Sequence, residues 1–341
     1  MKILVTGGTG YIGSHTSVEL MNQGFEIVII DNLSNSNIKV LDGIKAITGI
    51  RPEFEKLDLC QAEALDNFFK KNDQINAIIH FAAYKAVGES VENPIKYYHN
   101  NLVSLLNLLQ AMKKYQVPFM VFSSSCTVYG EARELPVTEN SPVQPAESPY
   151  GNTKQIAEEI LHEFVNSQDK IQAVALRYFN PIGAHPSSHI GELPIGEPEN
   201  LVPYITQTGI GLRDHLNIFG NDYETPDGTA VRDYLHVVDL AKAHVATLKR
   251  LLSQQNKKPY EVFNLGMGKG VSVLEMIQSF NRVSGKTLNY KLVDRRQGDI
   301  EKIWADTSLA TKELGWKTES SLDEAMKTAW DWEKRLNEKQ S

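Results

Sequence analysis

Tyr150 and Lys154 have the residue types and the spacing of a proton-transfer pair. They directly follow Pro149 and begin a segment whose apolar spacing predicts a helix, so this i, i+4 pair shares one helix face. A phenol titrates near ~10, but an ammonium about 4 Å away stabilises its phenolate by about 4 kcal/mol, or roughly three pKa units. We therefore predict that Lys154 lowers the pKa of Tyr150 into the range of a general base. Such pairs are common by chance, so this interpretation depends on the surrounding motifs.

Three serines, Ser123, Ser124 and Ser125, follow an apolar run over 119–122 that predicts a buried strand. In open α/β sheets, ligands bind at the carboxyl ends of the strands. We therefore predict that Ser125 orients, by hydrogen bonding, the hydroxyl group from which Tyr150 takes a proton.

Gly7, Gly10 and Gly13 stand at three-residue spacing between an apolar run over 3–5 and a helical pattern. The first glycine allows a sharp turn, the second allows close approach to a pyrophosphate, and the third allows the helix to pack on the strand. The helix N-terminus then offers free N–H groups to phosphates. A plain tight turn is the alternative, but the strand, turn, helix and second strand in sequence favour dinucleotide binding.

Asp31 ends the second apolar run, 18 residues past Gly13. A carboxylate at this place accepts hydrogen bonds from ribose hydroxyls and repels a 2′-phosphate. Because residues 32–50 contain no arginine, NAD is favoured over NADP. Asp58 is assigned either to the adenine amino group or to a simple turn.

Short apolar runs alternate with helical stretches along the first half of the chain, at 3–5, 27–30, 77–81, 119–122 and 173–176. Continuous apolar strands alternating with helices indicate a parallel sheet buried on both faces. The predicted class is α/β, a doubly wound parallel sheet of Rossmann type with a second, smaller mixed α/β substrate domain.

Four prolines and three glycines in 181–200 mark a loop-rich boundary. Residues 1–180 are predicted to form the NAD-binding domain, with 233–265 returning to it through a helix and a strand at 261–265. Residues 181–232 and 266–341 are assigned to the substrate domain. We expect Asp239 to be the N-cap of its helix.

The chain of 341 residues carries a net charge of −7, which argues against nucleic-acid or anionic-membrane binding. Cys60 and Cys126 suggest neither a disulfide framework nor a zinc site, and no metal is expected. Cys126 is expected to be a small buried residue. No apolar run approaches the ~18 residues of a membrane span, and no signal peptide is seen. A reducing, cytoplasmic setting is therefore expected.

Residues 6–13 (TGGTGYIG) and 150–154 (YGNTK) resemble the extended short-chain dehydrogenases/reductases. Five further stretches resemble, within that family, the UDP-glucose 4-epimerases: 86–90 (AVGES), 123–130 (SSSCTVYG), 176–181 (LRYFNP), 218–223 (IFGNDY) and 231–234 (VRDY). The resemblance implies reversible inversion at carbon 4 of a UDP-hexose, through a transient 4-keto sugar and a tightly bound NAD. The implied catalytic residues are Ser125, Tyr150 and Lys154.

The resemblance also implies two sets of binding residues. The NAD set is Gly7, Gly10, Tyr11, Ile12, Gly13, Asp31, Asn32, Asn35, Ser36, Asp58, Leu59, Phe81, Lys85, Asn100, Tyr150, Lys154 and Phe179. The UDP-sugar set is Ser125, Tyr150, Tyr178, Asn180, Asn200, Leu201, Phe219, Arg232, Arg296, Asp299 and Ile303. Two arginines suit a diphosphate because their planar groups donate in pairs, so we expect Arg232 and Arg296 to converge on one pyrophosphate.

Two departures bear on the reaction. Dehydratases of this superfamily carry Asp-Glu where this chain has Cys126 and Thr127, which disfavours elimination of water. Many strict glucose/galactose enzymes have Tyr where this chain has Ile303, so some activity on UDP-N-acetylhexosamines is expected. The alternatives are a UDP-N-acetylglucosamine 4-epimerase, another NAD-dependent nucleotide-sugar oxidoreductase, and a binding protein that senses NAD.

The segment 102–112 has apolar residues around more than one face, which is more than contact with a sheet requires. Together with 156–165 it either covers the sheet or also forms a helical interface between two copies. A homodimer is favoured.

Overall fold

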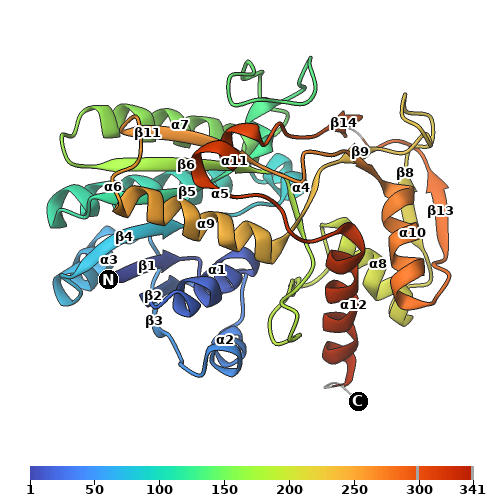
Figure 1. Cartoon of the computed structure of the whole chain (residues 1–341), viewed down its shortest axis with the longest axis horizontal. Coiled ribbons are helices and arrows are strands. Elements are labelled where there is room, and N and C mark those ends of the chain that lie inside the picture. The colour runs from blue at the N-terminus through green and yellow to red at the C-terminus, as the bar shows by residue number, and fades with distance from the viewer. Residues whose placement is uncertain (297–298, 339–341) are drawn as a thin grey trace.

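Figure 1 shows a computed structural model of the chain, which describes residues 1–296 and 299–338. In this part, the main sheet has seven strands in the order β11-β6-β5-β4-β1-β2-β3, all parallel. These strands are β1 (Lys2–Thr6), β2 (Glu26–Asp31), β3 (Glu53–Lys56), β4 (Ile75–His80), β5 (Phe119–Ser125), β6 (Gln172–Tyr178) and β11 (Tyr260–Leu265). The predicted return of the strand at 261–265 is confirmed, since β11 pairs with β6 at the sheet edge.

Helices cover both faces of this sheet because side chains alternate along each strand. In β1, Ile3 and Val5 enter one core with residues of α1 (Tyr11–Asn22), α2 (Val40–Thr48), α9 (Val237–Leu252) and α11 (Ser308–Leu314). Leu4 enters the other, with residues of α3 (Ala62–Lys71), α6 (Ser104–Tyr115) and α7 (Pro149–Asn166). The fold class predicted from the apolar runs is confirmed.

The strand order reverses beside β1. From β1 the chain continues through β2 to β3 on one side, whereas β4, β5, β6 and β11 lie on the other. The helices that leave β1 and β4 therefore diverge, and a crevice opens at the carboxyl ends of these two strands. The glycine turn and the three serines both end strands at this edge.

A smaller region of short strands and helices lies beyond this edge, at the right of Figure 1. Its helices α8, α10 and α12 share a third core with strand residues that include Ile218 and Val271. The strands pair as β10-β7, β12-β9-β14 and β13-β8. The bounds are β7 (Asn180–Ile182), α8 (Leu201–Ile210), β8 (Leu216–Phe219), β9 (Val231–Arg232), β10 (Tyr234–His236), β12 (Val271–Ser272), α10 (Val273–Ser284), β13 (Tyr290–Val293), β14 (Lys302–Ile303) and α12 (Leu322–Glu338).

One local prediction, the N-cap of α9, needs correction, and one helix proves longer than predicted. The N-cap of α9 is His236, whose ring accepts the N–H of Val238, whereas Asp239 lies in the first turn of the helix and accepts N–H groups of Glu319 and Ser320. Asp239 was assigned as N-cap from residue type alone, and its tertiary partners lie about 80 residues away. The predicted helix at 102–112 is the end of a longer helical run made of α4 (Val87–Glu92), α5 (Pro94–Tyr98), the π-helix η1 (His99–Val103) and α6.

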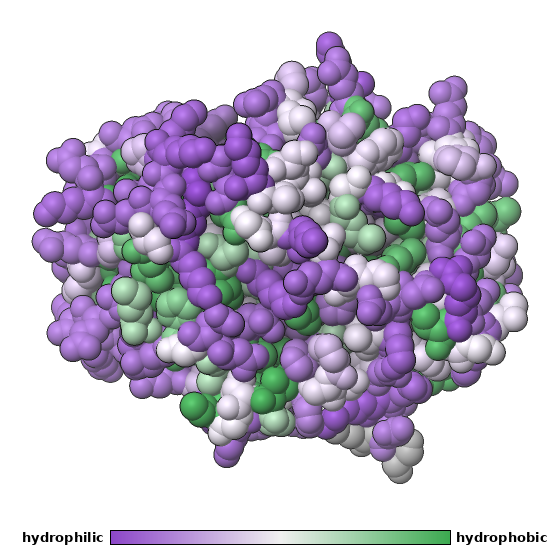
Figure 2. Space-filling view, in the orientation of Figure 1, coloured by the Kyte–Doolittle hydropathy of each residue, from purple (hydrophilic) through white to green (hydrophobic). Residues whose placement is uncertain are grey.

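The face of the molecule in Figure 2 is mainly hydrophilic, with apolar side chains interspersed in small groups. Among the described residues, no helix is both long enough and apolar enough to cross a membrane.

Candidate active site

A cavity of about 640 Å³ lies along the carboxyl ends of β1, β4, β5 and β6. The segment 191–200 lines its other side. All members of the predicted NAD set line it: Gly7, Gly10, Tyr11, Ile12, Gly13, Asp31, Asn32, Asn35, Ser36, Asp58, Leu59, Phe81, Lys85, Asn100, Tyr150, Lys154 and Phe179. Tertiary structure thus brings together residues that the chain spreads over about 170 positions.

In the turn after β1, glycines leave the backbone free of side chains at the place where a phosphate would lie. Gly7 has a φ of +71°, and a Cβ at Gly13 would lie 2.3 Å from the carbonyl oxygen of Gly7. Gly10 is the N-cap of α1, no side chain caps this end, and the first turn carries no acidic residue. The N–H groups of this helix end are therefore available to an anion, and the turn fits the pyrophosphate of a dinucleotide.

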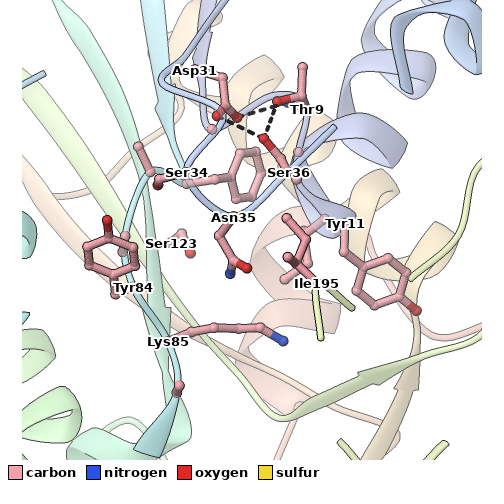
Figure 3. Close-up of a pocket in the computed structure, with 18 of the residues that line it drawn as sticks. Thr9, Tyr11, Asp31, Ser34, Asn35, Ser36, Tyr84, Lys85, Ser123 and Ile195 are labelled. Atoms are coloured by element: carbon pink, nitrogen blue, oxygen red, sulfur yellow. Dashed lines mark hydrogen bonds between the residues drawn. The ribbon is translucent and has the colours of Figure 1, made fainter. Parts of the chain in front are cut away.

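Asp31 holds the loop that follows β2. Its carboxylate accepts the N–H of Thr9 at 3.3 Å and the hydroxyl of Ser36 at 3.0 Å (Figure 3). It also accepts the N–H of Leu33 at 2.9 Å. These bonds place the carboxylate at the cavity, where a ribose hydroxyl could reach its remaining lone pairs. Asp58 also lines the cavity, and it accepts the N–H of Cys60 at 2.9 Å, so the simple turn is present there as well.

The start of α7 positions the predicted proton-transfer pair. The hydroxyl of Ser148 caps the helix by accepting the N–H of Gly151 at 3.1 Å, and Pro149 occupies the first helical position. Lys154 Nζ donates to the carbonyl oxygen of Ser123 at 2.7 Å and lies 6.0 Å from the centre of the Tyr150 ring. The two side chains and Ser125 therefore meet at the edge of β5, as predicted.

Burial acts on both groups of this pair. It raises the pKa of Tyr150 to about 12, against the opposing effect of the Ser125 hydroxyl, and lowers that of Lys154 to about 8, against the charge of Glu158. The predicted fall in the pKa of Tyr150 is thus absent in the protein alone. Desolvation of the buried phenolate is the largest effect on this pKa, and it outweighs the hydrogen bond from Ser125.

The predicted UDP-sugar set divides into two groups. Ser125, Tyr150, Tyr178, Asn180 and Asn200 line the cavity. The lining described does not include Leu201, Phe219, Arg232, Arg296, Asp299 or Ile303.

The two arginines of this second group have other partners. Arg296 donates to Asp299 at 2.8 Å and lies 5.5 Å from the ring centre of Phe219, next to the undescribed residues 297–298. Arg232 donates to the carbonyl oxygen of Val231 at 2.9 Å. Their predicted convergence on one pyrophosphate is not visible in this lining and stays a prediction.

Ile303 is buried in a small apolar cluster with Val128, Tyr129, Phe179 and Ala305. Of this cluster, Phe179 lines the cavity. Residue 303 therefore belongs to a buried cluster that reaches the cavity wall through Phe179.

Several lining residues were missed by sequence reasoning, among them Thr9, Tyr84, Glu192 and Ile195. Lys85 extends below Asn35 in Figure 3, and its Nζ lies 3.5 Å from the carboxylate of Glu192. For 191–200, the proline and glycine content indicates a loop, and the resemblance implies a ligand contact at Asn200, but neither indicates that the rest of the loop lines the cavity. Cys126, expected to be buried, is half-buried and lines the cavity.

The chain is similar to known proteins over nearly its whole length. The family model described as GDP-mannose 4,6 dehydratase matches residues 4–329. The chain is 51% identical over 333 residues to the UDP-glucose 4-epimerase of Bacillus subtilis (strain 168), covering 98% of this chain and 97% of that protein. It is 48% identical over 340 residues to the UDP-glucose 4-epimerase of Mus musculus, with 98% and 97% covered.

Two solved structures match over 99% of each chain, both at 44% identity. The UDP-glucose-4-epimerase from Stenotrophomonas maltophila, with bound NAD and formylated UDP-arabinopyranose, has a TM-score of 0.96. The UDP-glucose 4-epimerase from Bifidobacterium longum, in complex with NAD+ and UDP, has a TM-score of 0.94. The similarity therefore spans the glycine turn, the cavity and the smaller region together.

Proposed function

The chain belongs to the UDP-glucose 4-epimerases of the extended short-chain dehydrogenase/reductase family, and we propose that it interconverts UDP-glucose and UDP-galactose with bound NAD. The observation that carries this proposal is one cavity in which the unblocked glycine turn, Asp31 and the trio of Ser125, Tyr150 and Lys154 all meet. The turn and Asp31 suit a dinucleotide, and the trio suits proton transfer at a sugar hydroxyl.

The cofactor and the chain divide the reaction between them. NAD, when bound, supplies the acceptor for the hydrogen and electron pair at carbon 4. Tyr150 Oη takes the proton of the 4-hydroxyl and returns it once the 4-keto sugar presents its other face. Ser125 Oγ donates a hydrogen bond that holds the oxygen at carbon 4 in place.

Lys154 supplies positive charge next to Tyr150. With a pKa of about 8, it is mostly protonated at pH 7. Its Nζ lies 6.0 Å from the centre of the Tyr150 ring, and a positive charge there favours the phenolate. This offsets part of the desolvation that raises the pKa of Tyr150, and a cationic nicotinamide ring offsets more.

The substrate side is proposed to come from the second region, 181–232 and 266–341. Asn200 of this region lines the cavity, next to Asn180 at the end of the first region, which supports sugar contacts from this side. Leu201, Phe219, Arg232, Arg296 and Asp299 are assigned to the UDP moiety, the aromatic ring to uracil and the guanidinium groups to the diphosphate. Residues 1–180 with 233–265 are assigned to NAD.

A second substrate class is supported by Ile303. Its cluster contacts the cavity through Phe179, and an aliphatic residue is smaller than the tyrosine of strict enzymes. UDP-N-acetylhexosamines are therefore proposed as additional substrates.

A homodimer is proposed through the helical run 87–115. Val87, Val91, Ile95 and Leu106 are large apolar side chains exposed along it, and Ile95 is 78% exposed. Burial of such side chains favours association by about 25 cal/mol per Å². Sedimentation velocity of the parent and of Ile95→Asp tests this; a parent that is monomeric at micromolar concentration contradicts it.

A cytoplasmic location also stays a proposal. Both cysteines, Cys60 and Cys126, are free thiols, as a reducing setting requires.

Incubation with UDP-galactose, followed by separation of the products, tests the proposed function. The epimerase converts it to UDP-glucose without net build-up of NADH. A net oxidoreductase accumulates NADH in proportion to product, and a protein that only binds NAD leaves UDP-galactose unchanged.

A further inference from the structure

A buried ion pair lies behind the catalytic edge and has no part in the proposed mechanism. Arg177 on β6 donates to Glu158 on α7 through Nη2 at 2.6 Å and through Nε at 3.0 Å, and both residues are buried. Replacement of buried ion pairs by apolar residues is often neutral or stabilising, so stability alone is a weak reason for such a pair.

Glu158 also holds the strand that carries the serines. Its Oε1 accepts the hydroxyl of Ser124 at 2.5 Å. The two neighbours of Ser124 are Ser123, whose carbonyl oxygen accepts Lys154 Nζ, and Ser125. One carboxylate is thus bonded to the middle residue of the segment that positions both the lysine and the substrate hydroxyl.

Arg177 is connected to the site through Tyr178, the next residue of β6. Tyr178 is hydrogen-bonded to the hydroxyl of Ser123 and lines the cavity. Arg177 Nη1 donates to the hydroxyl of Tyr129 at 3.1 Å, which in turn donates to Asn264 on β11 at 2.6 Å. The bonded chain therefore joins α7, β5, β6 and β11 directly beneath the reacting groups.

Glu158 is also one helical turn from Lys154 and acts on its charge. The groups that face Lys154 from other elements are His80 on β4 and Phe122 on β5, whose ring centre is 4.9 Å from Nζ. The pKa of His80 is lowered to about 3 by burial, so this ring is neutral at pH 7. Tyr150, on the same helix, is also neutral at that pH. The charge of Glu158 favours the protonated form of Lys154.

We propose that Glu158 is a positioning residue, which ties α7 to β5 and β6 and keeps a negative charge one turn from Lys154. The inference rests on the proposed function for the identity of the reaction, but its first test needs no turnover. Glu158 is outside the cavity lining described, so it acts through Lys154 and Ser124 and not on the ligand itself.

The test is an NMR pH titration of the protein labelled with [ε-13C]lysine, in which the Lys154 signal is assigned by its absence from Lys154→Arg. We expect the parent to titrate near 8, and Glu158→Gln to titrate at least roughly one unit lower, because an opposite charge is lost and Arg177 is left unpaired. The alkaline limb of the kcat profile for UDP-galactose moves down by the same amount, while KM changes less than about twofold.

Two variants separate this role from a general effect. Glu159→Gln removes the same charge from the next position, which is exposed, and is expected to leave the Lys154 pKa unchanged. Glu158→Asp keeps the charge and is expected to retain the parental lysine pKa. If Glu158→Gln fails to fold, the double variant Glu158→Gln/Arg177→Gln is used in its place. A smaller fall in the Lys154 pKa is then expected, because the negative charge of Glu158 and the positive charge of Arg177 are both removed.

An unchanged Lys154 pKa in Glu158→Gln, or in the double variant where that is used, overturns the proposal. Equal shifts in Glu158→Gln and Glu159→Gln overturn it as well. If the parent does not convert UDP-galactose, the proposed function fails, whereas the lysine titration still decides the role of Glu158.

Discussion

The hydroxyl of Tyr11 donates to the carbonyl oxygen of Gly183 at 2.6 Å. This bond joins the first turn of α1 to the loop after β7, 172 residues further along the chain. The turn assigned to the pyrophosphate and the region assigned to the sugar nucleotide are therefore in direct contact.

Loss of the phenolic oxygen at position 150 should nearly abolish turnover. Tyr150→Phe keeps the ring in its buried place but has no group that can move the proton. We expect kcat for UDP-galactose to fall by about 10²–10⁴-fold with little change in substrate affinity. Product analysis measures the rate, and parental circular dichroism shows that the fold is kept. A variant as fast as the parent contradicts the assigned role.

Removal of the charge at position 154 should stabilise the cofactor-free protein while it inactivates it. Burial lowers the pKa of Lys154 from 10.5 to about 8, so the unfolded chain binds more protons between these pH values and stability rises with pH across this window. Below pH 8 the full penalty, about 3 kcal/mol, is present.

Lys154→Met lacks this penalty but also loses the bond to Ser123, worth about 1 kcal/mol. We expect urea unfolding to show a gain of about 2 kcal/mol at pH 7 that disappears by pH 10. A variant less stable than the parent at pH 7 contradicts the prediction.

His15 should make the protein sensitive to acid. The ring is buried, its Nδ1 lies 2.7 Å from the carbonyl oxygen of Tyr11, and its Nε2 has no partner among the described residues. Burial lowers its pKa to about 3. Because the unfolded chain takes up this proton below about pH 6.5, stability is lost as the pH falls from there toward 3.

In His15→Phe, the loss of unfolding free energy between pH 7 and pH 5 should be about 2 kcal/mol smaller than in the parent. Urea unfolding at the two pH values measures it. His162→Phe, at an exposed ring, is the control. Equal losses in the parent and His15→Phe argue against this cause.

A methyl group at Gly13 should prevent dinucleotide binding. The Cβ of Gly13→Ala would lie 2.3 Å from the carbonyl oxygen of Gly7, so the turn must shift. Gly88→Ala is the matched control, because its Cβ would meet nothing within 4 Å. We expect NAD affinity, measured by calorimetry, to fall about tenfold or more only in Gly13→Ala, which is at least about 1.4 kcal/mol.

Residue 303 should set the tolerance for N-acetylated sugars. A larger ring in the cluster with Phe179 must displace its neighbours toward the cavity or strain the core by about 1–3 kcal/mol. We expect Ile303→Tyr to lower kcat/KM for UDP-N-acetylglucosamine more than for UDP-galactose, and Ile303→Val to change neither ratio. Equal exclusion of the N-acetyl sugar by the parent and by Ile303→Tyr would contradict this prediction.

Two local features of the site, the glycine turn and the pair of Tyr150 and Lys154, could be predicted from residue type and spacing. The glycine turn depends on backbone room at Gly7 and Gly13, and the shared face of Tyr150 and Lys154 follows from the helical repeat. The strands of the sheet are readable because burial on both faces leaves unbroken apolar runs. Strand β3 was not predicted, because it is a short edge strand with three charged residues out of four.

Sequence alone thus determined the central strands of the main sheet, the helix that carries Tyr150 and Lys154, and the side chains presented to the edge of the sheet, since these are properties of consecutive residues. Tertiary structure decided the electrostatics: Tyr150 becomes a weaker acid in the protein alone because distant segments exclude water from it. It also decided that Glu158 meets Ser124 and Arg177, and that 191–200 lines one side of the cavity. Desolvation and long-range contacts depend on how remote segments pack, and no local spacing encodes that.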